Sequence, residues 1–179
     1  MKKFISVILM AALALSLFAA CGKTETQTPN APKGNDLSGE TLTAIVDKIY
    51  EKKMPEFPVG PMELDLADGE TLMYMAGISD ASLVKEVLVS EAMMGSQAYS
   101  MVLARVNDAA KAEEVANMML ENINPRKWIC VGADDIDAAI YGDLVLFVMI
   151  DSQYGIPAAD FIGEFKTIAG GALDKELSK

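Results

Sequence analysis

The feature that most constrains the fold is an unbroken apolar run, Leu144 to Ile150, which directly follows Gly142-Asp143. Side chains of a strand point alternately to the two faces of a sheet. A strand that is apolar at every position must therefore be covered on both faces. The run predicts a central strand in a sheet that other elements cover on each side.

Two β-hairpins are predicted by turn residues between β-rich segments. The first joins Val84–Met94 to Ala98–Val106 through Gly95-Ser96-Gln97, a three-residue turn that contains Gly. The second joins Ile136–Tyr141 to Leu144–Ser152 through the two-residue turn Gly142-Asp143. Both turns favour antiparallel pairing of their flanking strands. A shorter strand is predicted from Met62 to Leu66, because Pro55, Pro58 and Pro61 disfavour regular structure before it.

Helical periodicity and capping residues predict four helices. They are Gly39–Lys53 after Ser38, Gly69–Ala76 between Asp68 and Gly77, a helix between Asp108 and Pro125, and Pro157–Ala169 before Gly170-Gly171. The predicted class is α+β, a mainly antiparallel sheet of two hairpins with helices packed on it, in the order α-(β)-α-ββ-α-ββ-α. The two ββα segments suggest a pseudo-repeat. Residues 37–179 are expected to form a single domain.

The N-terminus has the parts of a secretion signal. Lys2 and Lys3 precede the apolar stretch Phe4–Leu17, and Ala19-Ala20 supplies small residues before a cleavage point. A retained transmembrane helix needs about 20 apolar residues, and this stretch is shorter. Residues 1–20 are therefore predicted to be a signal peptide.

Cys21 stands at the end of that segment, in the sequence Leu17-Phe18-Ala19-Ala20-Cys21. The pattern resembles the lipobox of bacterial lipoproteins, although Phe18 replaces the usual aliphatic residue. The resemblance implies a lipidated Cys21, whose acyl chains anchor the protein to the membrane. Residues 21–36 contain Thr, Pro, Gln and Asn but no large apolar residue, so they are predicted to be a flexible tether. The expected location is the extracytoplasmic face of the cell membrane.

Charge limits the class of partner. Without Lys2 and Lys3 the chain has 13 basic and 26 acidic residues, a formal charge of −13. Such a chain has no basic surface for nucleic acid, and it attracts cationic peptides, amines or metal ions. Solubility on a crowded cell surface is nevertheless the favoured interpretation of this charge, ahead of a specific cation-binding role.

Nucleophilic catalysis finds little support. The chain has no His, which excludes Ser-His and Cys-His pairs and His-ligated zinc. Cys130 lies in the apolar stretch Trp128–Val131 and is predicted to be a buried, inert thiol. Ser82-Leu83-Val84-Lys85 matches the Ser-x-x-Lys string of serine acyl-enzymes, but the chain lacks their other motifs. We therefore assign no catalytic residue, no metal site and no cofactor.

Two acidic clusters leave carboxylate chemistry open: Glu63, Asp65, Asp68 and Glu70 in one, and Asp134, Asp135, Asp137 and Asp143 in the other. Paired carboxylates serve glycoside hydrolysis, and oxygen ligands bind Ca²⁺. Neither cluster matches a calcium-binding loop, so solvated loop acids are the favoured interpretation.

Methionine is abundant, and Met73-x-Met75 has the thioether ligands that suit Cu(I). Met101, Met118 and Met119 have the positions of core residues in a strand and a helix. Several exposed methionines in one place would favour an adaptable peptide-binding surface.

Several segments together resemble a family of clostridial lipoproteins classified as domain of unknown function 4358. They are the lipobox, Tyr74–Ile78, Lys85–Val89, the Ala-rich helix through Glu113-Glu114-Val115, and the strands around Tyr141-Gly142-Asp143. The resemblance covers most of the expected domain. It implies a tethered α+β module and brings no known activity, cofactor or catalytic residue.

The sequence thus predicts a membrane-anchored lipoprotein that acts as a noncatalytic interaction or ligand-binding module. Its partners would be the membrane, through the lipid, and an unknown protein, peptide or small molecule. The alternative is a carboxylate-dependent cell-surface hydrolase.

Overall fold

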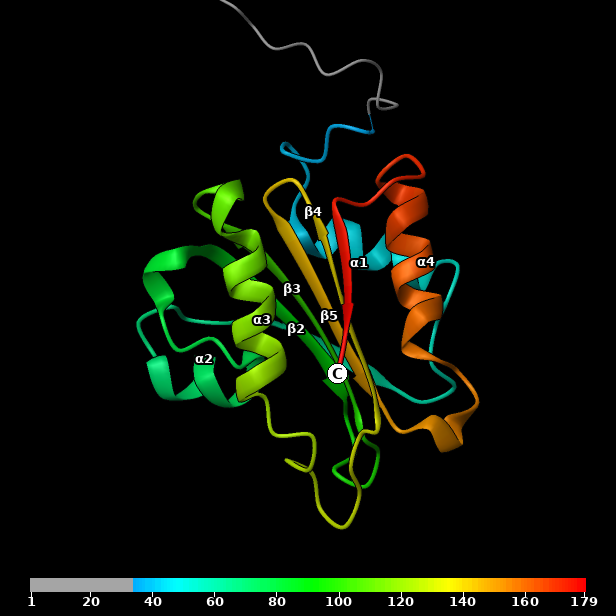
Figure 1. Cartoon of the computed structure of the whole chain (residues 1–179). Helices are drawn as coiled ribbons and strands as arrows, with labels where there is room; N and C mark the ends of the chain where they lie inside the picture. The colour runs from blue at the N-terminus through cyan, green and yellow to red at the C-terminus, as the bar shows by residue number, and fades with distance from the viewer. Residues whose placement is uncertain (1–33) are drawn as a thin grey trace, which may run out of the picture. The chain divides into compact units, whose positions relative to one another are not determined.

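The computed structural model describes residues 34–179, which build a six-stranded antiparallel sheet with helices on both faces (Figure 1). The strands are β1 (Val59–Glu63), β2 (Val84–Ala92), β3 (Tyr99–Val106), β4 (Asp135–Tyr141), β5 (Leu144–Ile150) and β6 (Lys175–Ser178). Their order across the sheet is β1-β2-β3-β5-β4-β6. The predicted α+β class is confirmed. The predicted signal peptide, Cys21 and most of the predicted tether lie outside the described residues.

The two predicted hairpins form the middle of the sheet. β2 pairs with β3, β4 pairs with β5, and the hairpins meet where Val102 of β3 lies opposite Phe147 of β5. Every residue of β5 is buried, as its apolar sequence requires. Gly142 has a φ of 58° in the turn between β4 and β5, a conformation that costs glycine little.

The two edge strands were harder to predict. β1 begins at Val59 and contains Pro61, so the expectation that prolines delay regular structure until Met62 is wrong. Pro61 is tolerated because β1 pairs only with β2, and a missing N–H on an edge strand need not break the ladder. At the other edge, β6 follows the last helix and pairs with β4, although its sequence predicted no strand.

The helices are α1 (Leu42–Tyr50), α2 (Gly69–Ala76), α3 (Ala112–Asn122) and α4 (Ala158–Ile168). Asp68 caps α2 and Gly77 ends it with a φ of 71°, as predicted. The first helix is shorter than predicted, because the Thr41 hydroxyl, and not Ser38, accepts from the Ala44 N–H. Asp108 caps a short 3-10 turn, Ala109–Lys111, that leads into α3.

The sheet separates two apolar cores. α2 and α3 cover one face, and α1 and α4 cover the other (Figure 1). Along β5 the side chains alternate between them, with Phe147 in the first core and Leu146 and Val148 in the second. Because α3 and α4 lie on opposite faces, the two ββα segments are not related by the two-fold axis of the β3–β5 pair. The suggested pseudo-repeat therefore has no symmetric counterpart in the fold.

The start of the described chain is held against the domain. The Asn35 N–H donates to the Ala169 carbonyl at 2.9 Å, and the Tyr141 hydroxyl donates to the Asn35 carbonyl at 2.7 Å. Arg105, almost fully buried on β3, donates to the carbonyl of Glu40 at 2.7 Å. These bonds fix the place where residues 34–40 enter the fold, next to the β4–β5 turn.

Candidate functional site

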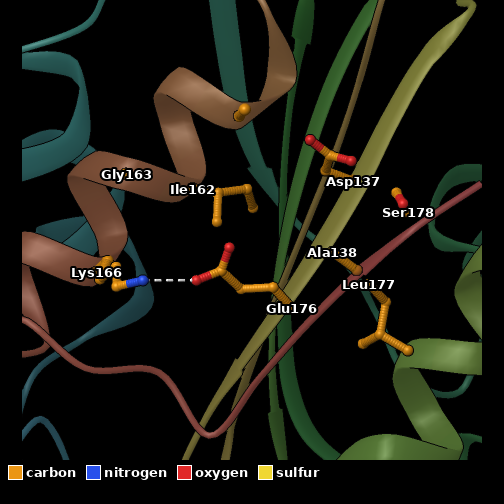
Figure 2. Close-up of a pocket in the computed structure, with 9 residues that line it drawn as sticks. Asp137, Ala138, Ile162, Gly163, Lys166, Glu176, Leu177 and Ser178 are labelled. Atoms are coloured by element: carbon orange, nitrogen blue, oxygen red, sulfur yellow. Dashed lines mark hydrogen bonds and ion pairs between the residues drawn. The ribbon is translucent and has the colours of Figure 1, made fainter.

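A groove of about 370 Å³, called the β6 groove below, lies between α4 and the edge of the sheet formed by β4 and β6 (Figure 2). One wall is a stripe of α4, in which Ala159, Ile162, Gly163 and Lys166 follow each other at helical spacing. The other wall comes from the two strands, with Asp137, Ala138, Glu176, Leu177 and Ser178. The groove therefore combines a small apolar wall with two carboxylates and a hydroxyl.

The position of α4 depends on Asp135. The helix begins after Pro157, whose side chain cannot cap it. A carboxylate oxygen of Asp135 on β4 instead accepts the Ala158 N–H at 2.9 Å. This bond ties the first turn of α4 to the strand that carries Asp137 two residues later, so the groove has a fixed wall.

Asp137 is the distinctive residue of the groove. Its side chain is half-buried on the α4 face of β4, and among the described residues it forms no hydrogen bond and no ion pair. Burial raises the pKa of Asp137, and the negative charges of Asp135 and Glu176 raise it further. A cation brought next to this carboxylate would relieve an unfavourable charge.

Glu176 differs from Asp137 because it already has a cation. Lys166 of α4 donates to a Glu176 carboxylate oxygen at 2.8 Å across the groove (Figure 2). Both side chains are about half exposed, so the pair contributes little to stability. The ion pair spans the groove and occupies the charge of Glu176. Of the two acids that line the groove, Asp137 is then the one without a bonded partner in the described structure.

The edge strand β6 offers unpaired backbone groups beside the groove. The Lys179 N–H donates to the Ile136 carbonyl at 3.0 Å, which makes the neighbouring pair of Asp137 and Ser178 a non-hydrogen-bonded pair. By the alternation of an antiparallel ladder, the N–H and C=O groups of Glu176 and Ser178 face away from β4. Among the described strands, only β4 pairs with β6, so a further strand can pair with its other edge.

The predicted acidic clusters do not converge. In the first, Asp65 accepts the Ala67 N–H, and Asp68 caps α2 by accepting from the Thr71 N–H and hydroxyl. These bonds lower the pKa of Asp68. In the part of the chain that the structure describes, no three acidic or Cys side chains form a group that would hold a metal ion.

The second cluster is spread along the β4–β5 hairpin. Asp134 accepts from the N–H and hydroxyl of Ser152, and these bonds lower its pKa. Asp143 lies at the far end of the hairpin, where it pairs with Arg105 at 3.1 Å. Of the four acids, Asp137 is the half-buried carboxylate that lines the groove and has no bonded partner among residues 34–179.

Ser82 and Lys85 do not form a catalytic pair. The Ser82 hydroxyl donates to Asp80 at 2.6 Å, and the same carboxylate accepts the Ser82 N–H. This arrangement caps the short 3-10 turn before β2. Ser82 is therefore a capping residue.

The prediction that Cys130 is buried is wrong. Its thiol is exposed, and its backbone has a φ of 64°, in the left-handed region. The stretch around it is a loop between α3 and β4, tied down by the Ile129 N–H, which donates to the Gly95 carbonyl at 3.0 Å. Trp128 packs against the core, whereas Ile129 and Cys130 point outward because the loop has no alternating strand pairing.

The methionines are divided between core and surface. Met101 and Met119 are buried, as predicted, whereas Met93 is 71% exposed and Met94 52% at the β2–β3 turn. Met73 is exposed on α2, and Met75 packs against the core. Residues two apart on a helix point in nearly opposite directions, so this pair does not chelate one copper ion.

Sequence reasoning missed Glu176 and Ser178 as groove residues. They lie on a strand with a single apolar residue, Leu177, which gives no alternating pattern to detect. Their role follows only from the pairing of β6 with β4.

Comparison with known proteins returned no match to a family model, a curated protein or a solved structure. Among residues 34–179, no helix is both long and apolar enough to cross a bilayer. The resemblance to a lipoprotein family and the lipid anchor at Cys21 thus stay predictions.

Proposed function

We propose that this protein is an extracytoplasmic lipoprotein, anchored through Cys21, whose domain binds extended peptide segments that carry a basic side chain. The observation that carries the proposal is the half-buried Asp137 carboxylate, which has no bonded partner within residues 34–179 and lies beside the open edge of β6. Strand addition to a sheet edge supplies backbone hydrogen bonds, and neighbouring pockets select side chains.

Geometry supports this mode of binding. A segment paired with β6 would meet the N–H and C=O groups of Glu176 and Ser178, and its side chains on the α4 face would lie along the groove. A Lys or Arg side chain has an apolar stem that fits against Ile162. Its charged end would neutralise Asp137.

Charge supports the choice of a cationic ligand. The domain is strongly acidic, and its field attracts basic peptides before contact. β6 is short and carries charged residues, Lys175 and Glu176, which oppose pairing with arbitrary apolar strands. Selectivity would therefore come from the basic side chain and affinity from the backbone bonds.

The direct test uses a short fluorescein-labelled peptide of alternating Val and Thr with one central Lys. We expect saturable binding by fluorescence anisotropy, and perturbed amide NMR signals in β6 and α4. A peptide with norleucine in place of Lys should bind at least about tenfold more weakly. Equal affinity for the two peptides would contradict a cation-selective groove.

Two variants that each remove one negative charge distinguish the effect of the groove on peptide affinity from the effect of the domain's net charge. Asp137→Asn should weaken binding of the Lys peptide by about tenfold. Glu121→Gln removes one negative charge from the exposed surface of α3, away from the groove, and should change affinity less than about twofold. If both variants lose affinity to the same extent, net charge and not the groove attracts the peptide.

The lipid anchor is tested separately with the full chain expressed in a bacterium that processes lipoproteins. We expect the wild type to partition into detergent and to yield an N-terminal peptide whose mass includes a diacylglycerol on Cys21. Cys21→Ser should stay in the aqueous phase. Cys130→Ser, which removes the exposed second thiol, is the matched control and should partition like the wild type.

A carboxylate-dependent hydrolase remains the second candidate, favoured by one observation. Asp137, whose pKa is raised, and Glu176 line the same groove, and two carboxylates in different environments can serve as acid and base. Hydrolysis of neutral oligosaccharides or peptides that is abolished in Asp137→Asn would favour this candidate. Binding of the Lys peptide without turnover would favour the interaction module.

A further inference from the structure

A second pocket, of about 590 Å³, lies on the opposite face of the sheet from the β6 groove, between α2 and the C-terminal end of α3. Figure 1 shows these two elements next to each other, on the side of the sheet away from α4. Met73 and Tyr74 of α2 form its apolar wall, and Asn122 and Asn124 stand on the α3 side. No residue of this pocket belongs to the groove described above.

Tyr74 is a large aromatic side chain that is exposed yet fixed in orientation. Its side chain is 54% exposed, but its hydroxyl donates to the Lys127 carbonyl at 3.0 Å. The Lys127 ammonium lies 5.8 Å from the ring centre, and it is itself buried and paired with Glu91. An immobilised ring with an open surface is a preorganised platform for stacking, because little rotamer entropy is lost on binding.

The polar groups around this ring have hydrogen-bond donors and acceptors that are not used within the protein. Asn122 uses one amide N–H on the Gly77 carbonyl, which leaves its Oδ1 free to accept. Asn124 accepts from the Arg126 N–H through Oδ1, which leaves its amide group free to donate. Among the described residues, the Glu70 carboxylate at the rim forms no hydrogen bond or ion pair, so it can accept as well.

The balance of charge narrows the ligand class. Glu70 contributes a negative charge to the rim, and none of the described residues that line the pocket carries a positive charge. Phosphorylated or carboxylated ligands are therefore disfavoured. The pocket favours a neutral polyhydroxylated ring. Such a ring can stack an apolar face on an aromatic side chain, and its hydroxyl groups both donate and accept hydrogen bonds.

We propose that the pocket between α2 and α3 binds a neutral carbohydrate, with one pyranose ring stacked on Tyr74 and its hydroxyl groups bonded to Asn122, Asn124 and Glu70. The ring presents C–H groups to the electron-rich face of Tyr74. The two amides and the carboxylate fix the orientation of the sugar. This site is independent of peptide binding at the β6 groove.

The test is titration of the folded protein with maltotriose, cellotriose and chitotriose, and with trigalacturonate as the anionic counterpart. Trp128, the single tryptophan of the chain, lies 5.5 Å from the same Lys127 ammonium and serves as a fluorescence reporter. Amide NMR signals of α2 and of residues 122–124 report binding directly. We expect at least one neutral trisaccharide to bind and trigalacturonate not to bind.

Variants locate the site. Tyr74→Ala should weaken the binding of that trisaccharide at least about tenfold, whereas Tyr74→Phe, which keeps the ring, should stay within about threefold of the wild type. Melting curves check that both variants are folded. Glu70→Ala, on the exposed side of α2, removes a hydrogen-bond acceptor of the same pocket without altering the ring. It should weaken binding about threefold or more.

Two results would overturn the proposal. One is the absence of any fluorescence or NMR change with all three neutral trisaccharides. The other is binding that Tyr74→Ala and Glu70→Ala leave unchanged, which would place the sugar elsewhere. Loss of Lys-peptide binding in Asp137→Asn concerns the other face of the sheet and bears on neither result.

Discussion

Asp135 of β4 accepts a hydrogen bond from the backbone N–H of Ala158, at 2.9 Å, and so caps the first turn of a helix that begins after a proline. The same strand places Asp137 two residues further on, on the same face of the sheet. One strand thus supplies both the residue that fixes the wall of the groove and the unpartnered acid within it.

Asp135→Ala is expected to lower the free energy of unfolding by about 1 kcal/mol, because the first turn of α4 loses its capping acceptor. Urea denaturation followed by circular dichroism measures the change. Asp135→Asn retains an acceptor oxygen and should lose less than half as much. Equal losses in the two variants would mean that charge, and not the cap, stabilises α4.

Asp137→Asn is expected to stabilise the protein at neutral pH. Burial and neighbouring acids raise the pKa of Asp137 above its ordinary value of 3.8, so the folded protein holds this proton more tightly than the unfolded chain. Stability from this group is therefore greatest below that value and declines as pH rises through the folded pKa. The difference in unfolding free energy between wild type and Asp137→Asn, measured against pH, should show this decline.

Other acids make contributions to the free energy of unfolding that change with pH in the opposite direction. The effect of Asp137 must therefore be measured as a difference between wild type and variant. Asp68 and Asp134 have lowered pKa values because they accept hydrogen bonds, and their contributions are lost as pH falls. The difference between wild type and Asp137→Asn isolates the contribution of Asp137 from those of these acids. A difference that does not change with pH would contradict a raised pKa of Asp137.

Gly163 offers one change that should raise stability and another that should block the groove. It lies within α4, and a Cβ atom added there meets no atom within 4 Å. Gly163→Ala should add up to about 1 kcal/mol to the free energy of unfolding, since glycine disfavours a helix interior. Gly163→Phe should place a ring at the α4 wall of the groove and weaken binding of the Lys peptide.

The two Gly163 variants are measured together by thermal unfolding and by fluorescence anisotropy. Gly163→Ala is the control for the helix effect and should retain peptide binding within about threefold. A folded Gly163→Phe variant that binds the peptide like the wild type would show that the peptide does not use this part of α4.

Arg105→Lys is expected to destabilise the fold by about 2 kcal/mol, although lysine carries the same positive charge as arginine. The guanidinium reaches Glu86 at 2.6 Å, Asp143 at 3.1 Å and the Glu40 carbonyl at 2.7 Å with different nitrogen atoms. A single ammonium cannot reach all three. Chemical denaturation measures the loss, and hydrogen exchange of residues 35–41 should rise with it.

Local sequence predicted the elements whose signals are complete within a few residues. The apolar run of β5 required cover on both faces, Asp68 and Gly77 delimited α2, and Gly142 marked the tight turn of the second hairpin. In each case a backbone conformation or a burial pattern follows from the residues themselves.

Local sequence did not predict the β6 groove. β6 has no alternating pattern, and its partner β4 lies more than thirty residues earlier in the chain. Cys130 looked like a core residue because of its neighbours, yet its loop runs along the surface. Sequence spacing also grouped Asp134, Asp135, Asp137 and Asp143 as equivalent acids.

By itself, the sequence determined the fold class, the central strand and most turns, because propensity, periodicity and capping act over short distances. Tertiary structure alone decided the roles of the four acids. Asp134 and Asp135 accept from backbone N–H groups, Asp143 pairs with Arg105, and Asp137 has no bonded partner in the described part of the chain. The physical reason is that pairing and burial of a carboxylate depend on residues brought near by the pairing of distant strands, which local spacing does not encode.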